Sequence, residues 1–217
     1  MHKHIKQLVG VLVFLTAILL SLVAATGQVI PAFSMRSTAP NAGSYEPITG
    51  RQRMQWFVRS TVGAESLAAG TFSAGFGTAR NRPEEYGPHW DGFGKRYAMR
   101  FTGVATSHAI EGAAGSLWGE DPRYFRAAGQ PFKGRMKNVV VMTFAARQSN
   151  GMLAPAYARY FGNAGSNFLS NTWRADSASG AGDAGVRILL GFAGKMGSNA
   201  FAEFWPDARR YIFRRKH

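Results

Sequence analysis

The sequence predicts an all-α fold, a single compact domain of about five or six helices that follows an N-terminal signal segment. Two observations favour this class. Apolar residues recur with the 3.6-residue period of an α-helix through most of residues 51–217. Rows of Gly, Ser and Ala four residues apart run along several of these stretches, which indicates helices that pack with their backbones close together.

Residues 1–25 have the pattern of a secretory signal peptide. Lys3 and Lys6 give a positive start, Leu8–Ala25 is an apolar stretch, and Val23-Ala24-Ala25 is a small-residue cleavage site. The alternative is an uncleaved membrane anchor, because this apolar stretch falls within the length range that spans a bilayer. Either interpretation predicts an exported chain, in the periplasm or cell envelope.

The helical domain is expected over residues 51–217, after a flexible lead-in at 26–50 that is rich in Pro, Gly, Ser, Thr and Ala. Thr49 is placed to cap the first helix. The periodic stretches predict helices over residues 51–79, 93–118, 133–148, 155–173 and 184–205.

Two proline-containing blocks are expected to begin helices. In "EDPRYF", Asp121 suits an N-cap and Pro122 the first helical position. In "EFWPD", Pro206 is expected to start a last helical piece, with arginines toward its C-terminal end as the helix dipole favours.

One pattern recurs in three of the expected helices: an aromatic residue, then Gly, Ser, His or Asn, and an apolar residue at fixed spacing. Because Gly and Ser four residues apart share a helix face, we expect them at close helix contacts, with the neighbouring His or Asn hydrogen-bonded there. Chance similarity among Gly-, Ala- and Ser-rich helices is the alternative. The pairs are Gly103 and Ser107, Gly162 and Ser166, and Gly194 and Ser198.

His108 and Glu111 are the candidates for catalysis, because residues three apart share a helix face and can form a base with its orienting carboxylate. This gives the alternative of a small hydrolase. The competing interpretation is a polar bridge between packed helices, and the sequence has neither HExxH nor GxSxG. We therefore expect a structural or interaction protein rather than an enzyme, without cofactor or metal.

The acidic pairs Glu84-Glu85 and Glu120-Asp121 both lie beside prolines at expected helix starts, so capping explains them without chemistry. Arg123 and Arg126 are candidates to pair with acids elsewhere in the fold.

Positive charge and the lack of cysteine limit the classes of partner and chemistry. Of the 26 Lys and Arg, two lie in the signal, which leaves 24 against 12 acidic residues and a net charge of +12. The expected partner of an exported basic chain is anionic lipid or another envelope polyanion, and no nucleic acid is expected. Without cysteine, disulfides and thiolate zinc sites are excluded.

The basic C-terminus is the candidate membrane-surface segment, because aromatic side chains anchor at the headgroups while arginines meet anionic lipid. Its residues are Arg209, Arg210, Tyr211, Phe213, Arg214, Arg215 and Lys216. An inert solvated end is the alternative. A multi-span membrane protein is the other alternative for the whole chain, although charges such as Glu65 and Glu111 within the expected helices make full insertion costly.

Several stretches together resemble a family of exported bacterial proteins without an assigned function. They include "FGKRYAMRFTGVATSHAIEG", "GEDPRYFR", "GNAGSNFLSNTWR" and "SNAFAEFWPDARRYIF", and the resemblance covers about residues 50–213. It implies export and carries over no catalytic residue. We therefore expect an exported, envelope-associated helical protein with a structural or interaction role.

Overall fold

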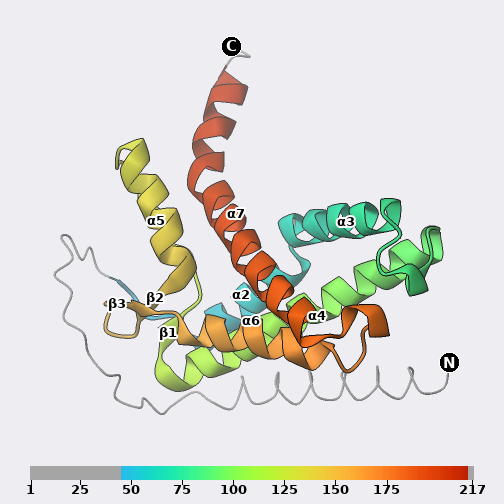
Figure 1. Cartoon of the computed structure of the whole chain (residues 1–217). Helices are drawn as coiled ribbons and strands as arrows, with labels where there is room; N and C mark the ends of the chain where they lie inside the picture. Colours follow the sequence, from blue (N-terminus) through green and yellow to red (C-terminus); the bar gives the residue numbers. More distant parts are fainter. Residues whose placement is uncertain (1–44, 215–217) are drawn as a thin grey trace.

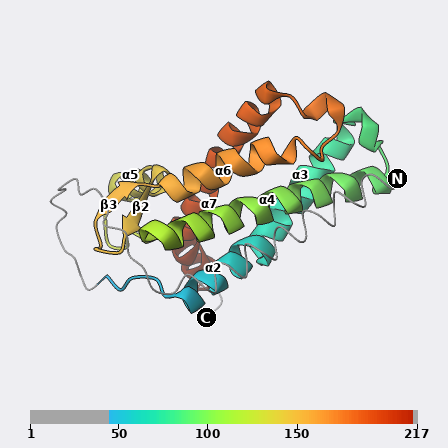
Figure 2. The same ribbon diagram turned by 90° about the horizontal axis from the view of Figure 1, so that it is seen from below.

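The centre of the fold is a pair of antiparallel helices, α4 (Trp90–Trp118) and α6 (Tyr157–Ser170), which lie side by side in both views (Figures 1 and 2). Helices α2 (Gly50–Val62) and α3 (Ala64–Ala79) pack along α4. Helix α7 (Ala181–Arg214) crosses α6 and then runs antiparallel to α5 (Phe132–Phe144). The predicted all-α class is therefore confirmed.

This computed structural model describes residues 45–214, so the predicted signal and most of the predicted lead-in lie outside the described residues. The remaining elements are short. They are η1 (Glu84–Tyr86), β1 (Glu120–Asp121), β2 (Ala145–Gln148), β3 (Leu153–Pro155) and η2 (Asp176–Ala178). The strands form an antiparallel sheet in the order β1-β2-β3, at the end of the α4–α6 pair.

The first helix starts where the sequence predicts. Thr49 accepts a hydrogen bond from the Gln52 backbone and donates its own N–H to the Gln52 side chain, which completes a capping box. The expected helix over 51–79 is however two helices, because the backbone is extended at Gly63. A Cβ on Gly63 would lie 2.2 Å from the Arg59 carbonyl oxygen, so glycine permits this tight junction.

Two expected helical segments belong to the small sheet instead. The block "EDPRYF" begins as strand β1, and Asp121 uses its carboxylate on Arg123 and Tyr45 rather than on a helix terminus. The helix expected over 133–148 ends at Phe144, and residues 145–148 pair with both β1 and β3. The pairing with β1 joins residues distant in sequence, which helical periodicity does not register.

Pro206 lies inside the continuous helix α7 and does not start a new piece. Proline cannot donate the usual hydrogen bond to the carbonyl four residues before it. Beside this position, the carbonyl oxygen of Glu203 accepts hydrogen bonds from Arg126 and Arg135. Side chains of other elements therefore hold the helix where the proline weakens it.

The interior is unusually polar. The largest fully buried side chains include Glu203, Asn199, Thr106, Thr143 and Asp121. Large apolar side chains lie exposed on several helices instead, among them Phe72, Phe132, Leu189 and Phe201. Such faces normally mark interaction sites in a folded protein, so both the polar interior and the apolar surface bear on function.

Candidate functional site

The first two copies of the repeated pattern lie against each other at the α4–α6 contact. A Cβ on Gly162 would come within 2.7 Å of the Ser107 carbonyl oxygen and 3.1 Å of Glu111, so only glycine fits. Ser166 is buried one turn later, where its hydroxyl donates to the Asn163 carbonyl. Gly162 is therefore a position of close backbone approach.

The other pattern glycines are placed differently. Gly103 is half-buried and has only the Arg174 guanidinium near its Cβ position, at 3.6 Å. Gly194 and Ser198 are exposed on α7, and a Cβ on Gly194 would meet no atom within 4 Å. The expectation of helix contact at all three copies needs this correction, since Gly194 faces away from the described fold.

The polar residues beside the pattern serines are all hydrogen-bonded. His108 pairs with Thr61 through its Nδ1 atom at 3.2 Å, and Asn199 donates to Thr143 Oγ1 at 3.1 Å. Asn167 donates to the Asn163 carbonyl at 2.8 Å. These groups bridge elements or turns, as a polar interior requires.

His108 and Glu111 do not bond to each other. Glu111 accepts from Arg159 at 3.0 Å, and Arg159 also donates to the Met142 and Thr143 carbonyls. The His108 ring packs edge-on against Trp56, and burial lowers its pKa to about 4. The two side chains of the hydrolase alternative are thus each engaged elsewhere.

Lys195 of α7 carries a further charge into this region. Burial lowers its pKa to about 8, and the Arg159 guanidinium adds to the shift while Glu111 opposes it. We call Glu111, Arg159, His108 and Lys195 the Glu111 cluster, because their charges act on one another. Sequence reasoning missed Arg159 and Lys195, which lie on other helices.

Next to this cluster, Glu120 is buried with an incomplete set of partners. Its Oε2 accepts from the Ala158 backbone at 3.0 Å, near the start of α6, while Oε1 has no hydrogen-bond partner among residues 45–214. Arg53 reaches the Glu120 carbonyl with Nη2, and its buried Nη1 also lacks a partner in the described chain. Burial raises the pKa of Glu120.

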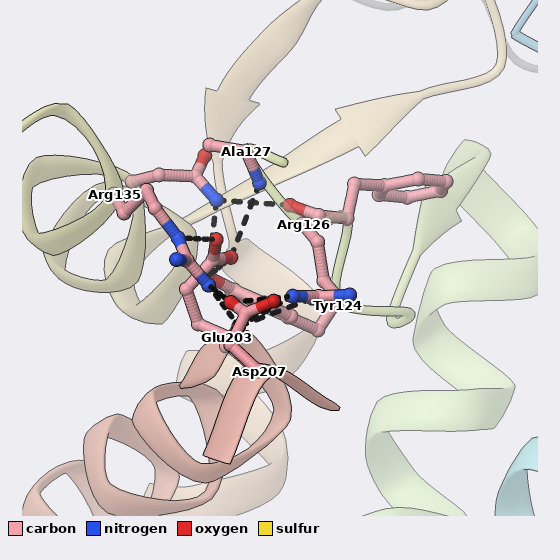
Figure 3. Close-up of polar contacts among 8 residues, drawn as sticks. Tyr124, Arg126, Ala127, Arg135, Glu203 and Asp207 are labelled. Carbon is pink, nitrogen blue, oxygen red and sulfur yellow. Dashed lines mark hydrogen bonds and ion pairs between the residues drawn. The ribbon is translucent and has the colours of Figure 1, made fainter. Parts of the chain in front are cut away.

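The two proline-containing blocks of the sequence meet around Glu203, as Figure 3 shows. The Glu203 carboxylate accepts from Tyr124 at 2.7 Å, from the Ala127 backbone at 3.1 Å and from Arg135 at 2.8 Å. We call these residues, with Arg126 and Asp207, the Glu203 cluster. It ties α7 to α5 and to the segment after β1.

Two arginines of the Glu203 cluster, Arg126 and Arg135, also pair with Asp207, an exposed residue of α7. Arg135 forms an ion pair with Asp207 at 2.6 Å, and Arg126 donates to the Glu203 carbonyl at 2.8 Å. Arg126 also forms an ion pair with Asp207 at 3.4 Å, an acid distant in sequence as expected, whereas Arg123 pairs with the nearby Asp121 at 2.7 Å. The sequence signal for this site was the shared Pro, acid and arginine composition of the two blocks.

The acidic pairs Glu84-Glu85 and Glu120-Asp121 also contact residues far along the chain. Glu85 accepts from the backbone and side chain of Ser177, at 3.1 and 2.8 Å, and so connects η1 to η2. Asp121 accepts from Tyr45 at 3.1 Å, and burial together with the Asp121 charge raises the pKa of Tyr45 to about 12. Both pairs bind the chain to itself.

Beyond Asp207, α7 projects past the body of the fold toward the C-terminus (Figure 1). Its aromatic and aliphatic side chains there are exposed: Tyr211 by 66%, Ile212 by 55% and Phe213 by 58%. Arg209 and Arg210 are exposed beside them. The side chain of Arg214, and residues Arg215 and Lys216, lie outside the described part of the chain.

None of the helices within residues 45–214 combines the length and apolar character needed to cross a bilayer. In the same residues, acidic and histidine side chains do not gather in a group of three that could hold a metal ion. Comparisons of the chain with family models, curated proteins and solved structures found no match. Contacts within the chain are therefore the basis on which a function is assigned.

Proposed function

We propose that this is an exported structural or interaction protein of the cell envelope, which binds anionic membrane surfaces through the C-terminal end of α7. The observation that carries the proposal is the exposed combination of Arg209 and Arg210 with Tyr211, Ile212 and Phe213. Basic side chains near an anionic surface contribute about 1 kcal/mol each, and aromatic side chains settle at the headgroup level.

The charge distribution supports this assignment. No acidic residue follows Asp207 in the sequence, and Asp207 itself is neutralised by Arg135 and Arg126. The end of α7 therefore presents uncompensated positive charge next to apolar side chains. Export is supported by the signal pattern of residues 1–25.

The Glu203 cluster gives this segment a fixed position. Because α5 and the chain after β1 hold α7 at Glu203 and Asp207, the following turns leave the fold in a defined direction. A membrane-binding element benefits from such an anchor, since less conformational freedom is lost when it binds.

Vesicle sedimentation tests the proposal. The full chain is mixed with phosphatidylcholine vesicles with or without phosphatidylglycerol. We expect stronger binding to the anionic vesicles, reduced by salt because the attraction is electrostatic. In the double variant Arg209→Gln/Arg210→Gln, the ratio of binding to anionic over neutral vesicles should fall several-fold.

The matched control is Arg51→Gln/Arg59→Gln, which removes two exposed arginines from α2 and the same net charge. It should keep most of the preference for anionic vesicles. Equal binding of the wild type to both kinds of vesicle, or equal losses in the two double variants, would contradict the proposed role of the α7 end.

A further inference from the structure

Between Val186 and Trp205, the charged side chains of helix α7 face the fold, while several of its large apolar side chains are exposed. Arg187 donates to the Ala178 carbonyl at 2.8 Å, Lys195 belongs to the Glu111 cluster, and Glu203 is fully buried. Six of the exposed positions form one stripe at helical spacing. Its members are Val186, Leu190, Gly194, Gly197, Phe201 and Trp205.

The two glycines of this stripe have no role inside the described fold. A Cβ on Gly194 or Gly197 would meet no atom within 4 Å. Glycine in a helix interior is less favourable than alanine, so two exposed glycines here need a reason outside the single chain. Fluid lipid chains can adapt to any side chain on a helix surface. A second rigid helix packs closely only where small residues let the two backbones approach.

The stripe is symmetric about its own centre, which lies between Lys195 and Met196. Gly194 and Gly197 are equally far from this point, and so are Leu190 and Phe201. Val186 and Trp205 are the third such pair. An antiparallel copy of the helix would therefore set glycine opposite glycine and an aliphatic residue opposite each aromatic one, the self-complementarity that a two-fold interface requires.

The charges at the ends of the stripe select this direction. Asp183 is exposed in the first turn of α7, and Arg209 and Arg210 are exposed after Trp205. An antiparallel pair brings Asp183 of one copy to the arginine end of the other. A parallel pair would place the arginines of both copies together, which costs free energy.

The size of the stripe is that of a small specific interface. Val186, Leu190, Phe201 and Trp205 are 58%, 64%, 42% and 42% exposed. With aromatic and large aliphatic side chains and their flanking residues, we estimate roughly 500 Å² per copy, so about 1,000 Å² in total. This is the lower end for a specific complex, so the association should be weak, in the micromolar range.

We propose that two copies of this protein associate through an antiparallel contact between their α7 helices, centred on Gly194 and Gly197. The proposal does not rest on membrane binding by the C-terminal end of α7. It assigns a role to the exposed apolar stripe and to the two glycines that the fold of one chain does not need.

Cysteine cross-linking tests both the contact and its direction, because the natural chain has no cysteine. The variants Leu190→Cys and Phe201→Cys are purified, one with an affinity tag, and oxidised singly or mixed. We expect a disulfide mainly between the two different chains in the mixture. Efficient coupling of Phe201→Cys to itself would indicate a parallel pair and overturn the proposed arrangement, and the absence of coupling above a Gly94→Cys collision control would overturn the contact itself.

Sedimentation equilibrium of the full chain provides the second measurement. Gly194→Leu/Gly197→Leu fills space that is open in one chain, so the unfolding midpoint should not fall, while self-association should weaken at least tenfold. Gly94→Leu, at another open and exposed helix position, is the matched control and should leave association unchanged. A wild type that stays monomeric at high micromolar concentration, or a double leucine variant that associates as well as the wild type, contradicts the proposal.

Discussion

Glu203 and Glu120 are both almost completely buried, yet their environments shift the carboxyl pKa in opposite directions. Burial alone would raise the pKa of Glu203, but donors from Tyr124, Arg135 and Ala127 together outweigh it and lower the pKa. Glu120 receives the Ala158 N–H, its Oε1 lacks a partner within residues 45–214, and burial raises its pKa. Hydrogen-bond donors and the Arg135 charge therefore outweigh burial at Glu203, whereas burial dominates at Glu120.

The Glu203 cluster and the Glu111 cluster, which lies next to Glu120, also differ in how well their charges are paired. The Glu203 cluster is a site where acids and arginines are matched and hold α7 in place. The Glu111 cluster contains two basic groups, His108 and Lys195, whose charged forms are disfavoured by burial. Substitutions of Glu203 should accordingly destabilise the fold, whereas neutral substitutions of Lys195 or His108 should leave it unchanged or more stable.

The largest effect is expected for Glu203→Gln. The amide keeps the shape but leaves Arg135 without its buried counter-charge, so the free energy of unfolding should fall by about 3 kcal/mol. Urea unfolding at pH 7 measures it. Because the folded-state pKa of Glu203 is lowered, its contribution is present above the unfolded-state pKa and is lost as pH falls through the folded-state value.

Asp207→Asn is the control within the same cluster. Asp207 also pairs with Arg135 but is nearly half exposed and screened by solvent, so its loss should cost much less than the loss of Glu203. Equal losses for the two variants would show that burial of the carboxylate does not set the strength of this cluster.

Lys195→Met should change stability in the opposite direction, by roughly 2 kcal/mol in favour of the folded state at pH 7. The pKa of Lys195 is lowered from 10.5 to about 8, so protonation favours the unfolded chain between these values. Wild-type stability should therefore fall as pH drops from about 10.5 to 8, and the variant should lack this slope. A loss of stability in the methionine variant would show that the attraction of the Glu111 charge outweighs the cost of burying the ammonium group.

Glu120→Gln should change the free energy of unfolding by less than about 1 kcal/mol, in contrast to Glu203→Gln. The environment of Glu120 already favours the neutral carboxyl group, and the amide oxygen can still accept from Ala158. Because the folded-state pKa is raised, wild-type stability declines as pH rises through that value, and the variant should not show this decline. Urea unfolding across pH 4 to 8 compares the two proteins, and a loss as large as that of Glu203→Gln would remove the contrast.

The smallest effect is expected for His108→Asn, which places at this position the residue found in the other two copies of the pattern. Folding and stability at pH 7 should stay within about 1 kcal/mol, because asparagine can keep a hydrogen bond to Thr61. The pKa of His108 is lowered from 6.5 to about 4, so the wild type loses stability as pH falls between these values. The far-ultraviolet circular dichroism signal, followed as the pH is lowered, should show a smaller loss of helix in the variant than in the wild type.

Local signals along the chain predicted much of the helical part of this fold. Thr49 and Gln52 carry a complete capping box, and Gly162 lies at the close contact that its spacing suggested. The helix expected over 133–148 is shorter in the structure. Its last residues, 145–148, instead form a strand that pairs with β1, far earlier in the chain, and with β3, a few residues later. Periodicity also gave no sign that Gly194 faces outward while Gly162 faces inward, since both occupy the same position of the repeated pattern.

The sequence by itself determined the helical class, the positive charge and the chemical likeness of the "EDPRYF" and "EFWPD" blocks, because composition and spacing are properties of the chain. Only the tertiary structure decided that these blocks bind each other around Glu203, and that Glu111 pairs with Arg159 rather than with His108. The physical reason is that an ion pair is selected by which helices pack together, and that choice depends on contacts between residues far apart in the chain.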